Sequence, residues 1–293
     1  MLWPKNLNKS IRTNVKLAGL TSFKVGGAAK FFFEAKNIKD LREALVIAKS
    51  AGIPVFILGA GSNILVSDSG LDGLVIKLGG GFFKRAHGVG TFLEAGGALK
   101  LNQLILYAKN NGLSGLEFLT GIPGTLGGAL AGNAGAWGKS ISSQVKEVAV
   151  LDYNGKQKSL GPKELKFSYR KSNLNKYVII SCKLKLRSSD KHTIGLMMRE
   201  YLLERNKVQN NNLPSAGCIF KNPGKNTAGK LIDACGLKGR SKGGALIANF
   251  HANFILNKGK ASSRDILFLM DLMQKSVKKR FEVNLEPEIR IWR

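Results

Sequence analysis

Apolar residues recur at helical spacing in four parts of the chain. Stripes over 41–48 and 101–108 predict amphipathic helices, and a further helix is expected over about 194–208. The clearest stripe runs over 266–277, after Ser262 or Ser263, either of which is a favourable residue for a helix N-cap. These stripes are most simply the buried faces of helices in a folded core.

Short apolar runs between these stripes predict strands. They lie at 31–35, 55–58, 64–66, 74–78, 178–186 and 285–291. A hairpin is expected over 145–160, because Asn154-Gly155 is a typical hairpin turn. Residues 1–20 read as a polar leader and 115–138 as a glycine-rich loop system. Helices and strands in this mixture indicate an α+β fold.

Charge is the most unusual property of the composition. The 293 residues carry 46 basic and 19 acidic side chains, a formal charge of +27. Such a balance permits nucleic acid, an anionic membrane or an anionic small molecule as partner. The basic residues form no block of five or six, which favours a lysine-rich solvated surface over a nucleic-acid-binding patch.

Other classes are poorly supported. Three cysteines are too few for a disulfide framework, and neither the Cys nor the three His residues show zinc-site spacing, so no metal is expected. The N-terminus shows no signal-peptide pattern, and the uncharged stretch 118–138 is interrupted by Gly and Pro. We expect a cytoplasmic protein with reduced thiols and no membrane partner.

Two glycine loops are candidates for binding phosphate groups through backbone amides. The first, Gly59-Ala60-Gly61-Ser62-Asn63, opens like a dinucleotide fingerprint, but Ile64 replaces the third glycine and a strand follows. A tight structural turn is its simplest interpretation. The second spans 120–138 within a stretch, 118–146, that contains no carboxylate, as suits a diphosphate site. A packing seam of small residues is the alternative.

Together with further pieces, these loops resemble the UDP-N-acetylenolpyruvoylglucosamine reductase family. The pieces occur in order: TSFKVGG at 21–27, GAGSN at 59–63, GIPGT at 121–125, GNAGA at 132–136, SYRKS at 168–172, GCIFKNP at 217–223, AGKLID at 228–233, GLKG at 236–239, HANFI at 251–255 and LEPEI at 285–289. The resemblance covers the chain from about residue 20 onward.

The resemblance implies a fold, a reaction and a set of cofactors. It implies a two-lobed FAD-binding part of the PCMH (vanillyl-alcohol oxidase) type over 1–188, with lobes of about 20–78 and 79–188. A smaller α/β substrate domain over 190–293 would follow. NADPH would reduce FAD, which then reduces the enolpyruvyl ether of UDP-N-acetylglucosamine to UDP-N-acetylmuramate in peptidoglycan synthesis. The cofactor-binding positions would be Gly59, Ala60, Gly61, Ser62, Asn63, Gly121, Pro123, Gly124, Thr125, Gly128, Asn133 and Ala134.

Catalytic residues follow from the same match. Arg170 would stabilise the enolate, since an arginine fork suits a carboxylate, and Glu288 would be the second stabiliser. Glu286 is the neighbouring carboxylate from which Glu288 must be told apart. Cys218 stands where most of the family has a serine proton donor, and a thiol is the stronger acid. A small buried residue is the alternative interpretation of Cys218.

Tyr169, Lys221 and Asn222 would lie near the substrate, and His251 is expected to be structural. Two other functions stay open at this stage: a different FAD oxidoreductase of the same cofactor fold, and a basic nucleic-acid-binding protein. The first would share the glycine loops but lack the set Arg170, Cys218 and Glu288. We expect a monomer that binds neither nucleic acid nor membrane.

Overall fold

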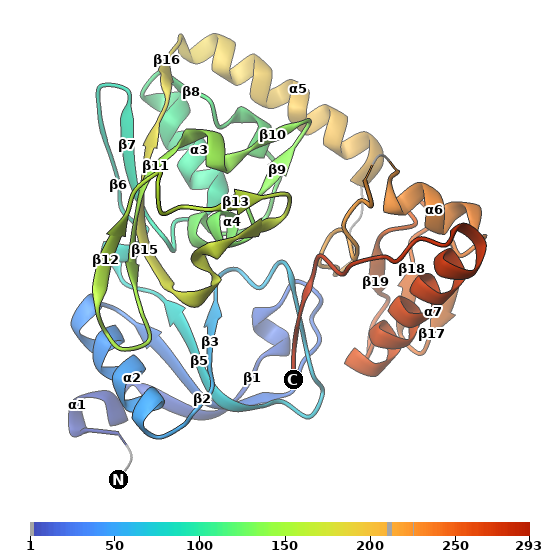
Figure 1. Ribbon diagram of the computed structural model, residues 1–293, viewed down its shortest axis with the longest axis horizontal. Helices are drawn as coiled ribbons and strands as arrows, with labels where there is room; N and C mark the ends of the chain where they lie inside the picture. The colour runs from blue at the N-terminus through green and yellow to red at the C-terminus, as the bar shows by residue number, and fades with distance from the viewer. Residues whose placement is uncertain (1–2, 210–212, 225) are drawn as a thin grey trace. The chain divides into compact units, whose positions relative to one another are not determined.

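The chain forms two compact units that are discontinuous in sequence. The computed structural model describes residues 3–209, 213–224 and 226–293 (Figure 1). One unit comprises 1–13, 31–60 and 73–205, and the other comprises 14–30, 61–72 and 206–293. This grouping follows compactness, so the predicted functional domains, 1–188 and 190–293, stay a prediction.

The first unit contains most of the secondary structure. Its helices are α1 (Lys5–Asn8), α2 (Ile38–Ser50), α3 (Leu101–Asn110), α4 (Leu126–Ala131) and α5 (Lys191–Gln209), the last of which ends beyond the unit. Its longer strands are β1 (Ile11–Lys16), β2 (Ala28–Ala35), β3 (Val55–Leu58), β5 (Leu71–Leu78), β6 (Ala86–Val89), β7 (Phe92–Gly96), β11 (Val145–Leu151), β12 (Gln157–Leu160) and β15 (Val178–Lys185), of which β1, β2 and β5 extend into the second unit. Two-residue strands are β8 (Leu113–Ser114), β9 (Gly135–Ala136), β10 (Lys139–Ser140), β13 (Phe167–Ser168), β14 (Lys171–Ser172) and β16 (Arg187–Ser188).

The main sheet of this unit has five antiparallel strands in the order β12-β11-β15-β7-β6. Alternate residues of a strand face opposite sides of the sheet. Val148 and Leu184 are therefore part of a core on one side, whereas the residues before and after each of them in the strand are not. Helices α3 and α4 contribute to that core through residues that include Leu104 and Leu130, both fully buried. The two helices therefore cover one face of the sheet, and α4 is itself part of the second glycine loop, 120–138.

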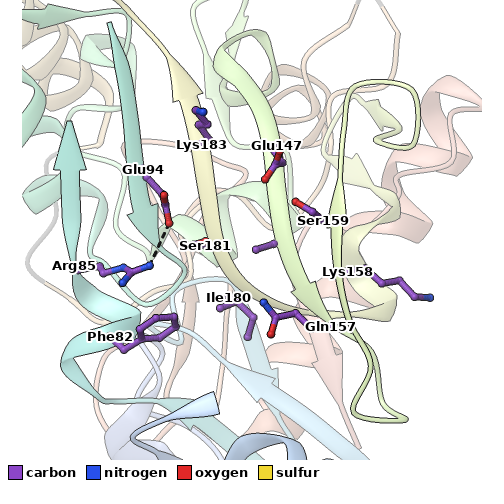
Figure 2. Close-up of a pocket in the computed structure, with 11 residues that line it drawn as sticks. Phe82, Arg85, Glu94, Glu147, Gln157, Lys158, Ser159, Ile180, Ser181 and Lys183 are labelled. Carbon is purple, nitrogen blue, oxygen red and sulfur yellow. Dashed lines mark hydrogen bonds and ion pairs between the residues drawn. The ribbon is translucent and has the colours of Figure 1, made fainter. Parts of the chain in front are cut away.

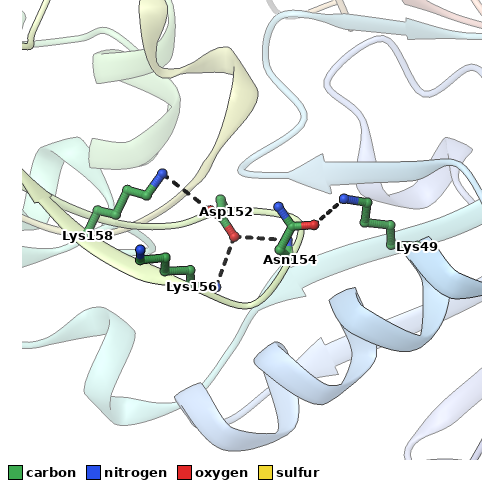
Figure 3. A network of polar contacts seen from close by, with 5 residues as sticks. All are labelled: Lys49, Asp152, Asn154, Lys156 and Lys158. Carbon is green, nitrogen blue, oxygen red and sulfur yellow. Dashed lines mark hydrogen bonds and ion pairs between the residues drawn. The ribbon is translucent and has the colours of Figure 1, made fainter.

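The predicted hairpin between β11 and β12 is confirmed, with its turn at Asn154-Gly155 (Figure 3). The Asp152 carboxylate accepts from the backbone N–H groups of Asn154 and Lys156, both at 2.9 Å. These bonds, the one from Lys156 foremost, lower the pKa of Asp152. Gly155 has φ +78°, and a Cβ there would lie 2.7 Å from the side chain of Arg42 on α2. Glycine is needed at this turn for both reasons.

A second sheet, in the order β1-β2-β5-β3, carries α2. The predicted stripe on α2 is buried, with Leu41 and Leu45 fully inaccessible. The side chain of Asn37 caps the helix by accepting from Asp40 N–H at 2.9 Å. Strand β3 runs parallel to β5 and ends at the buried Leu58, so the first glycine loop begins directly after a strand whose other three residues are half-buried.

The second unit is built from three separate chain segments. Its elements are β4 (Ile64–Val66), α6 (Ala228–Ala234), β17 (Ser241–Lys242), β18 (Ala245–Ile247), β19 (Ile255–Asn257), α7 (Ser263–Phe281) and β20 (Arg290–Trp292). Strands β17, β18 and β19 are antiparallel, and β20 pairs in parallel with β4. The predicted apolar face of α7 is buried, and Ser262 with Asp265 forms a reciprocal capping box.

Three predictions from the sequence are wrong. The supposed polar leader contains α1 and the sheet strand β1, and Trp3 and Leu7 in it are buried. The glycine-rich loop system contains the helix α4. The last strand covers 290–292 and not 285–291. The remaining predicted helices and strands are present with small changes at their ends. Within the described residues, no helix is both long and apolar enough to cross a membrane.

Asp68 joins the segment after β4 to the start of α7. Its carboxylate accepts from Ser263 N–H at 2.8 Å and from Ser263 Oγ–H at 2.8 Å. Ser263 is the first residue of α7, and the helix dipole favours negative charge at this N-terminus. We expect Asp68→Ala to lower the free energy of unfolding by about 1 kcal/mol, measured by chemical denaturation. Asp72→Ala is the matched control, because Asp72 makes only an exposed ion pair with Lys30 and should change little. Equal effects of the two substitutions would contradict the role of Asp68.

Candidate functional site

The first glycine loop lies against the N-terminus of α4. Thr125 caps α4, and its Oγ1 accepts from Gly128 N–H at 3.3 Å. A Cβ built on Gly59 would lie 2.9 Å from this same oxygen. A side chain at position 59 would thus displace the cap, so glycine at the end of β3 keeps the two glycine loops close together within the first unit.

The second loop is joined by backbone bonds to the turn after β7. Gly127 N–H donates to Gly97 O at 2.8 Å, and Leu101 N–H donates to Gly124 O at 3.0 Å. A Cβ on Gly97 would lie 2.3 Å from a backbone oxygen of β15. Sequence reasoning missed Gly97, although the pair Gly96-Gly97 directly after a strand was a signal of close backbone approach.

Thr120 begins the second loop and has an unusual hydroxyl. Its Oγ1 is buried and has no hydrogen-bond partner in the described part of the chain. Its carbonyl accepts from Arg205 Nε–H at 3.1 Å, and Arg205 packs where a Cβ on Gly121 would lie. A buried hydroxyl without a partner is costly, and a ligand oxygen beside this loop would satisfy it. The loop therefore has the features of a place where a ligand with polar oxygens binds.

Asn133 connects α4 to the hairpin that carries Arg170. Asn133 is 6% exposed, and its Nδ2 donates to Ser168 O at 2.9 Å. Ser172 Oγ–H donates to Ala131 O at 3.0 Å from the other strand of this hairpin, β13–β14. The two bonds fix both sides of a turn whose residues are Tyr169 and Arg170. Asn133, predicted to bind cofactor, has this structural role as well.

Left-handed backbone marks three non-glycine residues of this region. Asn133, Trp137 and Arg170 have φ of 45°, 50° and 53°. Such values are uncommon outside glycine, and strained residues gather at functional sites. The Arg170 guanidinium lies 5.2 Å from the ring centre of Tyr169, whose side chain is exposed. The hairpin therefore presents Arg170 and Tyr169 in a backbone geometry that the packing around Asn133 maintains.

In the second unit, the segments that carry Cys218 and Glu288 lie side by side. Glu288 N–H donates to Ile219 O at 2.7 Å, and Phe220 forms an isolated bridge with Pro287. Cys218 and Glu288 are each half-buried. The two predicted catalytic residues, 70 positions apart in the sequence, thus come from neighbouring segments of one unit.

The neighbouring candidates make contacts of their own. Lys221 Nζ pairs with Glu286 Oε1 at 2.5 Å, so the carboxylate next to Glu288 in the motif is engaged by a predicted substrate residue. Asn222 Oδ1 accepts from Ala228 N–H at 3.0 Å at the start of α6. Asn63 Nδ2 donates to Glu288 O at 3.1 Å. Asn63, predicted to bind cofactor, therefore holds the backbone of Glu288.

His251 is partly buried, and it lies two residues before Asn253, which bonds to residues 217–220, the cysteine segment. Its Nδ1 accepts from Asn253 N–H at 3.1 Å, which requires the neutral imidazole with its proton on Nε2. Burial lowers the pKa of His251, nearby Lys238 lowers it further, and Asp233 opposes the shift. This contact fits the prediction of a structural histidine.

A separate hollow of about 580 Å³ lies on the sheet face opposite α3 and α4 (Figure 2). It is lined by strand residues of mixed charge, among them Glu94, Glu147 and Lys183, and Arg85 pairs with Glu94 at 3.3 Å. None of the predicted site residues lines it. Elsewhere in the described ranges, no group of three or more His, Cys, Asp or Glu side chains is placed to hold a metal ion.

The predicted residues fall into two groups. The first unit holds Gly59, Ala60, Gly121, Pro123, Gly124, Thr125, Gly128, Asn133, Ala134, Tyr169 and Arg170, and the second holds Gly61, Ser62, Asn63, Cys218, Lys221, Asn222 and Glu288. Contacts within each unit connect Gly59 to Thr125, Asn133 to the Arg170 hairpin and Asn63 to Glu288. Their roles toward ligands stay predictions.

Comparisons with known proteins cover nearly the whole chain. A model of the FAD binding domain matches residues 29–161, and a model of the UDP-N-acetylenolpyruvoylglucosamine reductase C-terminal domain matches 208–292. A reductase of this name from Synechococcus sp. is 42% identical over 97% of this chain and 92% of its own length. UDP-N-acetylenolpyruvoylglucosamine reductase 2 from Symbiobacterium thermophilum is 40% identical over 96% of this chain and 92% of its own length.

A solved structure agrees with these sequences. The crystal structure of UDP-N-acetylenolpyruvylglucosamine reductase from Thermus caldophilus aligns with a TM-score of 0.83 and 35% identity. The alignment covers 97% of this chain and all of that chain. The predicted fold class, an α+β protein with an FAD-binding part and a smaller C-terminal domain, is thereby confirmed.

Stability should depend on pH through His251. Because burial lowers its pKa in the folded state, the unfolded chain binds a proton at higher pH than the folded chain does. The free energy of unfolding should therefore fall as pH drops below about 6.5, the unfolded value, and level off below the folded pKa. His251→Asn keeps a side-chain acceptor for Asn253 N–H without titrating, so denaturation curves between pH 7 and 5 should lose part of this slope.

His87→Asn is the control for this prediction, because His87 is exposed on β6. That variant should keep the slope of the unmodified protein. An unchanged slope in His251→Asn would show that another group causes the loss of stability.

Proposed function

Because the chain belongs to the UDP-N-acetylenolpyruvoylglucosamine reductase family, we propose that it reduces the enolpyruvyl ether of UDP-N-acetylglucosamine to UDP-N-acetylmuramate, with NADPH as the electron source. The chain is an oxidoreductase whose cofactor is FAD. The observation that carries the proposal is the bond from Glu288 N–H to Ile219 O, which places a carboxyl group and the Cys218 thiol on adjoining segments.

The first unit fits a dinucleotide on its own structural features. Gly121 and Gly124 have φ of +78° and +156°, so their amides are set in conformations that other residues rarely adopt. The buried Thr120 hydroxyl lacks a partner within the described residues and is suited to a ligand oxygen. The residues of this unit that would hold the cofactor are the predicted ones: Gly59, Ala60, Gly121, Pro123, Gly124, Thr125, Gly128, Asn133 and Ala134. The other predicted positions, Gly61, Ser62 and Asn63, belong to the second unit. When bound, FAD would supply the hydride that reduces the substrate's double bond.

Arg170 is the group suited to the negative charge of this reaction. Addition of hydride to the methylene carbon places charge on the neighbouring carbon and its carboxylate. A guanidinium binds a carboxylate through two parallel hydrogen bonds and becomes more stabilising as charge develops. The left-handed turn held by Asn133 keeps Arg170 in one backbone conformation, so little reorganisation is needed during the reaction.

Cys218 would complete the reduction by giving a proton to the carbon next to the carboxylate. One hydride and one proton then balance the reduced double bond, and the thiol is recharged from solvent after each turnover. Half-burial suits this role, because a donor must reach both the substrate and water. Glu288, on the adjoining segment, would stabilise the enolate by donating a hydrogen bond from its protonated carboxyl group.

Tyr169, Lys221 and Asn222 would contribute to binding of the substrate. Lys221 is paired with Glu286, so its ammonium is held at a defined place and could attract a diphosphate. Tyr169 is 54% exposed, so the ring that lies beside the Arg170 guanidinium also has an exposed aromatic surface suited to contact a ligand. Asn222 Oδ1 accepts from Ala228 N–H at 3.0 Å, which fixes its side chain beside the start of α6.

Purified protein tests the proposal directly. The sample should show flavin absorbance, and NADPH consumption should require the enolpyruvyl UDP-sugar. A yellow protein that consumes NADPH without this substrate would indicate another flavin oxidoreductase. A colourless protein that binds nucleic acid with strong salt dependence would reject the proposal.

Substitution of Cys218 separates proton donation from flavin reduction. We expect Cys218→Ala to leave reduction of the flavin by NADPH nearly unchanged and to slow its reoxidation by the enolpyruvyl substrate by about 100-fold or more, measured by stopped-flow absorbance. Cys218→Ser should restore much of this rate.

Cys235→Ala is the matched control, since Cys235 is a partly buried thiol at the end of α6. It should keep both half-reactions. A Cys218→Ala variant that reoxidises at the normal rate would remove the thiol from the mechanism.

A further inference from the structure

We infer that Asn253 is a positioning residue for proton donation, because its side-chain amide fixes the backbone segment that carries Cys218. The inference rests on the proposed function for its catalytic meaning. Asn253 is 1% exposed, so it does not reach a ligand itself. It acts through the peptide groups of Ile219 and Phe220.

One residue makes three hydrogen bonds to this segment. Asn253 Oδ1 accepts from Phe220 N–H at 3.0 Å, and Asn253 Nδ2 donates to Phe220 O at 2.8 Å. The Asn253 carbonyl accepts from Ile219 N–H at 2.9 Å. The side-chain amide thus takes the place of a peptide group in a neighbouring strand, and it pairs with both polar groups of Phe220.

These bonds are needed because the segment belongs to no regular sheet. Cys218 and Phe220 form only isolated bridges, with Phe254 and Pro287 respectively. Phe220 is 1% exposed, so its N–H and C=O cannot turn to water if Asn253 is removed. A side chain without an amide at position 253 would leave two buried polar groups unpaired and favour a shift of the segment.

The opposite edge of the same segment carries Glu288. Ile219 O accepts from Glu288 N–H at 2.7 Å, and Lys221 N–H donates to Glu286 O at 2.9 Å. The segment is therefore held between Asn253 and the 286–288 segment. A shift on the Asn253 edge would change the distance between Cys218 and Glu288 without touching either side chain.

The residue before Cys218 cannot replace this restraint. Gly217 has φ +76° and no atom within 4 Å of where its Cβ would be, so the chain enters Cys218 through a glycine in open space. The backbone position of Cys218 therefore depends on the bonds of Ile219 and Phe220 and on the bridge to Phe254, against which the Cys218 side chain packs. The turn that carries Asn253 is itself restrained, because Asn253 N–H donates to His251 Nδ1 at 3.1 Å.

Two measurements on Asn253→Ala and Asn253→Asp test this role. In the FAD-loaded enzyme, flavin reduction by NADPH should stay within about twofold, whereas reoxidation by the enolpyruvyl substrate should slow by about 100-fold in Asn253→Ala, as expected for a misplacement of about 1 Å. Asn253→Asp keeps the acceptor for Phe220 N–H and should lose less. Equal losses in both half-reactions would overturn the inference.

The second readout needs neither substrate nor turnover. The rate at which iodoacetamide alkylates Cys218 should change at least threefold in Asn253→Ala and have an altered pH profile, measured by peptide mass in a Cys235→Ala background. Cys182 does not interfere, because it is 1% exposed and burial raises the pKa of its thiol.

Asn257→Ala is the matched control for stability. Asn257 is also buried, and its amide holds Phe23 O at 2.9 Å and Gly259 N–H at 2.8 Å, away from the cysteine segment. It should lower stability without changing alkylation of Cys218. If Asn253→Ala does not fold, Asn253→Asp gives the same comparison.

The outcomes separate this inference from the proposed function. If the proposed function is wrong, the enolpyruvyl substrate will not reoxidise the flavin in the unmodified protein or in any variant. The alkylation rate of Cys218 will still show whether Asn253 positions this cysteine. If only the inference is wrong, the unmodified enzyme turns over and Asn253→Ala alkylates and reoxidises like the Asn257→Ala control.

Discussion

Buried and half-buried asparagine amides hold the irregular backbone on which the site depends. Glycine-rich loops leave many peptide groups without a neighbour in a sheet or helix, and each buried one needs a partner. Asn133 supplies partners to the Arg170 hairpin, Asn253 to the cysteine segment and Asn63 to the segment of Glu288. An amide can donate and accept at once, as a peptide can, so these residues extend hydrogen-bonded structure where strands stop. The conformation of such loops therefore depends on a few side chains.

Regular elements could be predicted from the sequence because their signals are local. The α7 stripe and its cap, and the turn at Asn154-Gly155, need no knowledge of distant residues. Strand β1 was missed because it is an edge strand whose residues are mostly polar, with Ile11 alone buried among its six residues. Helix α4 was missed because two of its six residues, Gly127 and Gly128, are glycines, which disfavour helices. Tertiary packing of Leu126 and Leu130 overrides that preference.

The candidate site could be predicted only in part, for a related reason. The motif pieces name Arg170, Cys218 and Glu288, but spacing along the chain does not say which segments touch. Nothing local indicates that Glu288 N–H meets Ile219 O or that Glu286 turns to Lys221. The supporting residue Asn253 was the least predictable, since it looks like an ordinary polar residue until its partners in the segment after Cys218 are known. These contacts do not explain the excess of basic residues over acidic ones. The ion pairs described are mostly exposed pairs on the surface, and they give the other lysines no role in the candidate site.

The parallel pairing of β4 with β20 has a consequence for biosynthesis. Asn63 and Glu288, which are bonded beside these strands, are separated by 225 residues, so the early strand leaves the ribosome long before its partner exists. Closing so long a loop is slow, and the apolar residues Ile64, Leu65 and Val66 stay without their native neighbour during translation. We expect the nascent chain to engage chaperones at this strand, and the second unit to mature only after synthesis has passed residue 292.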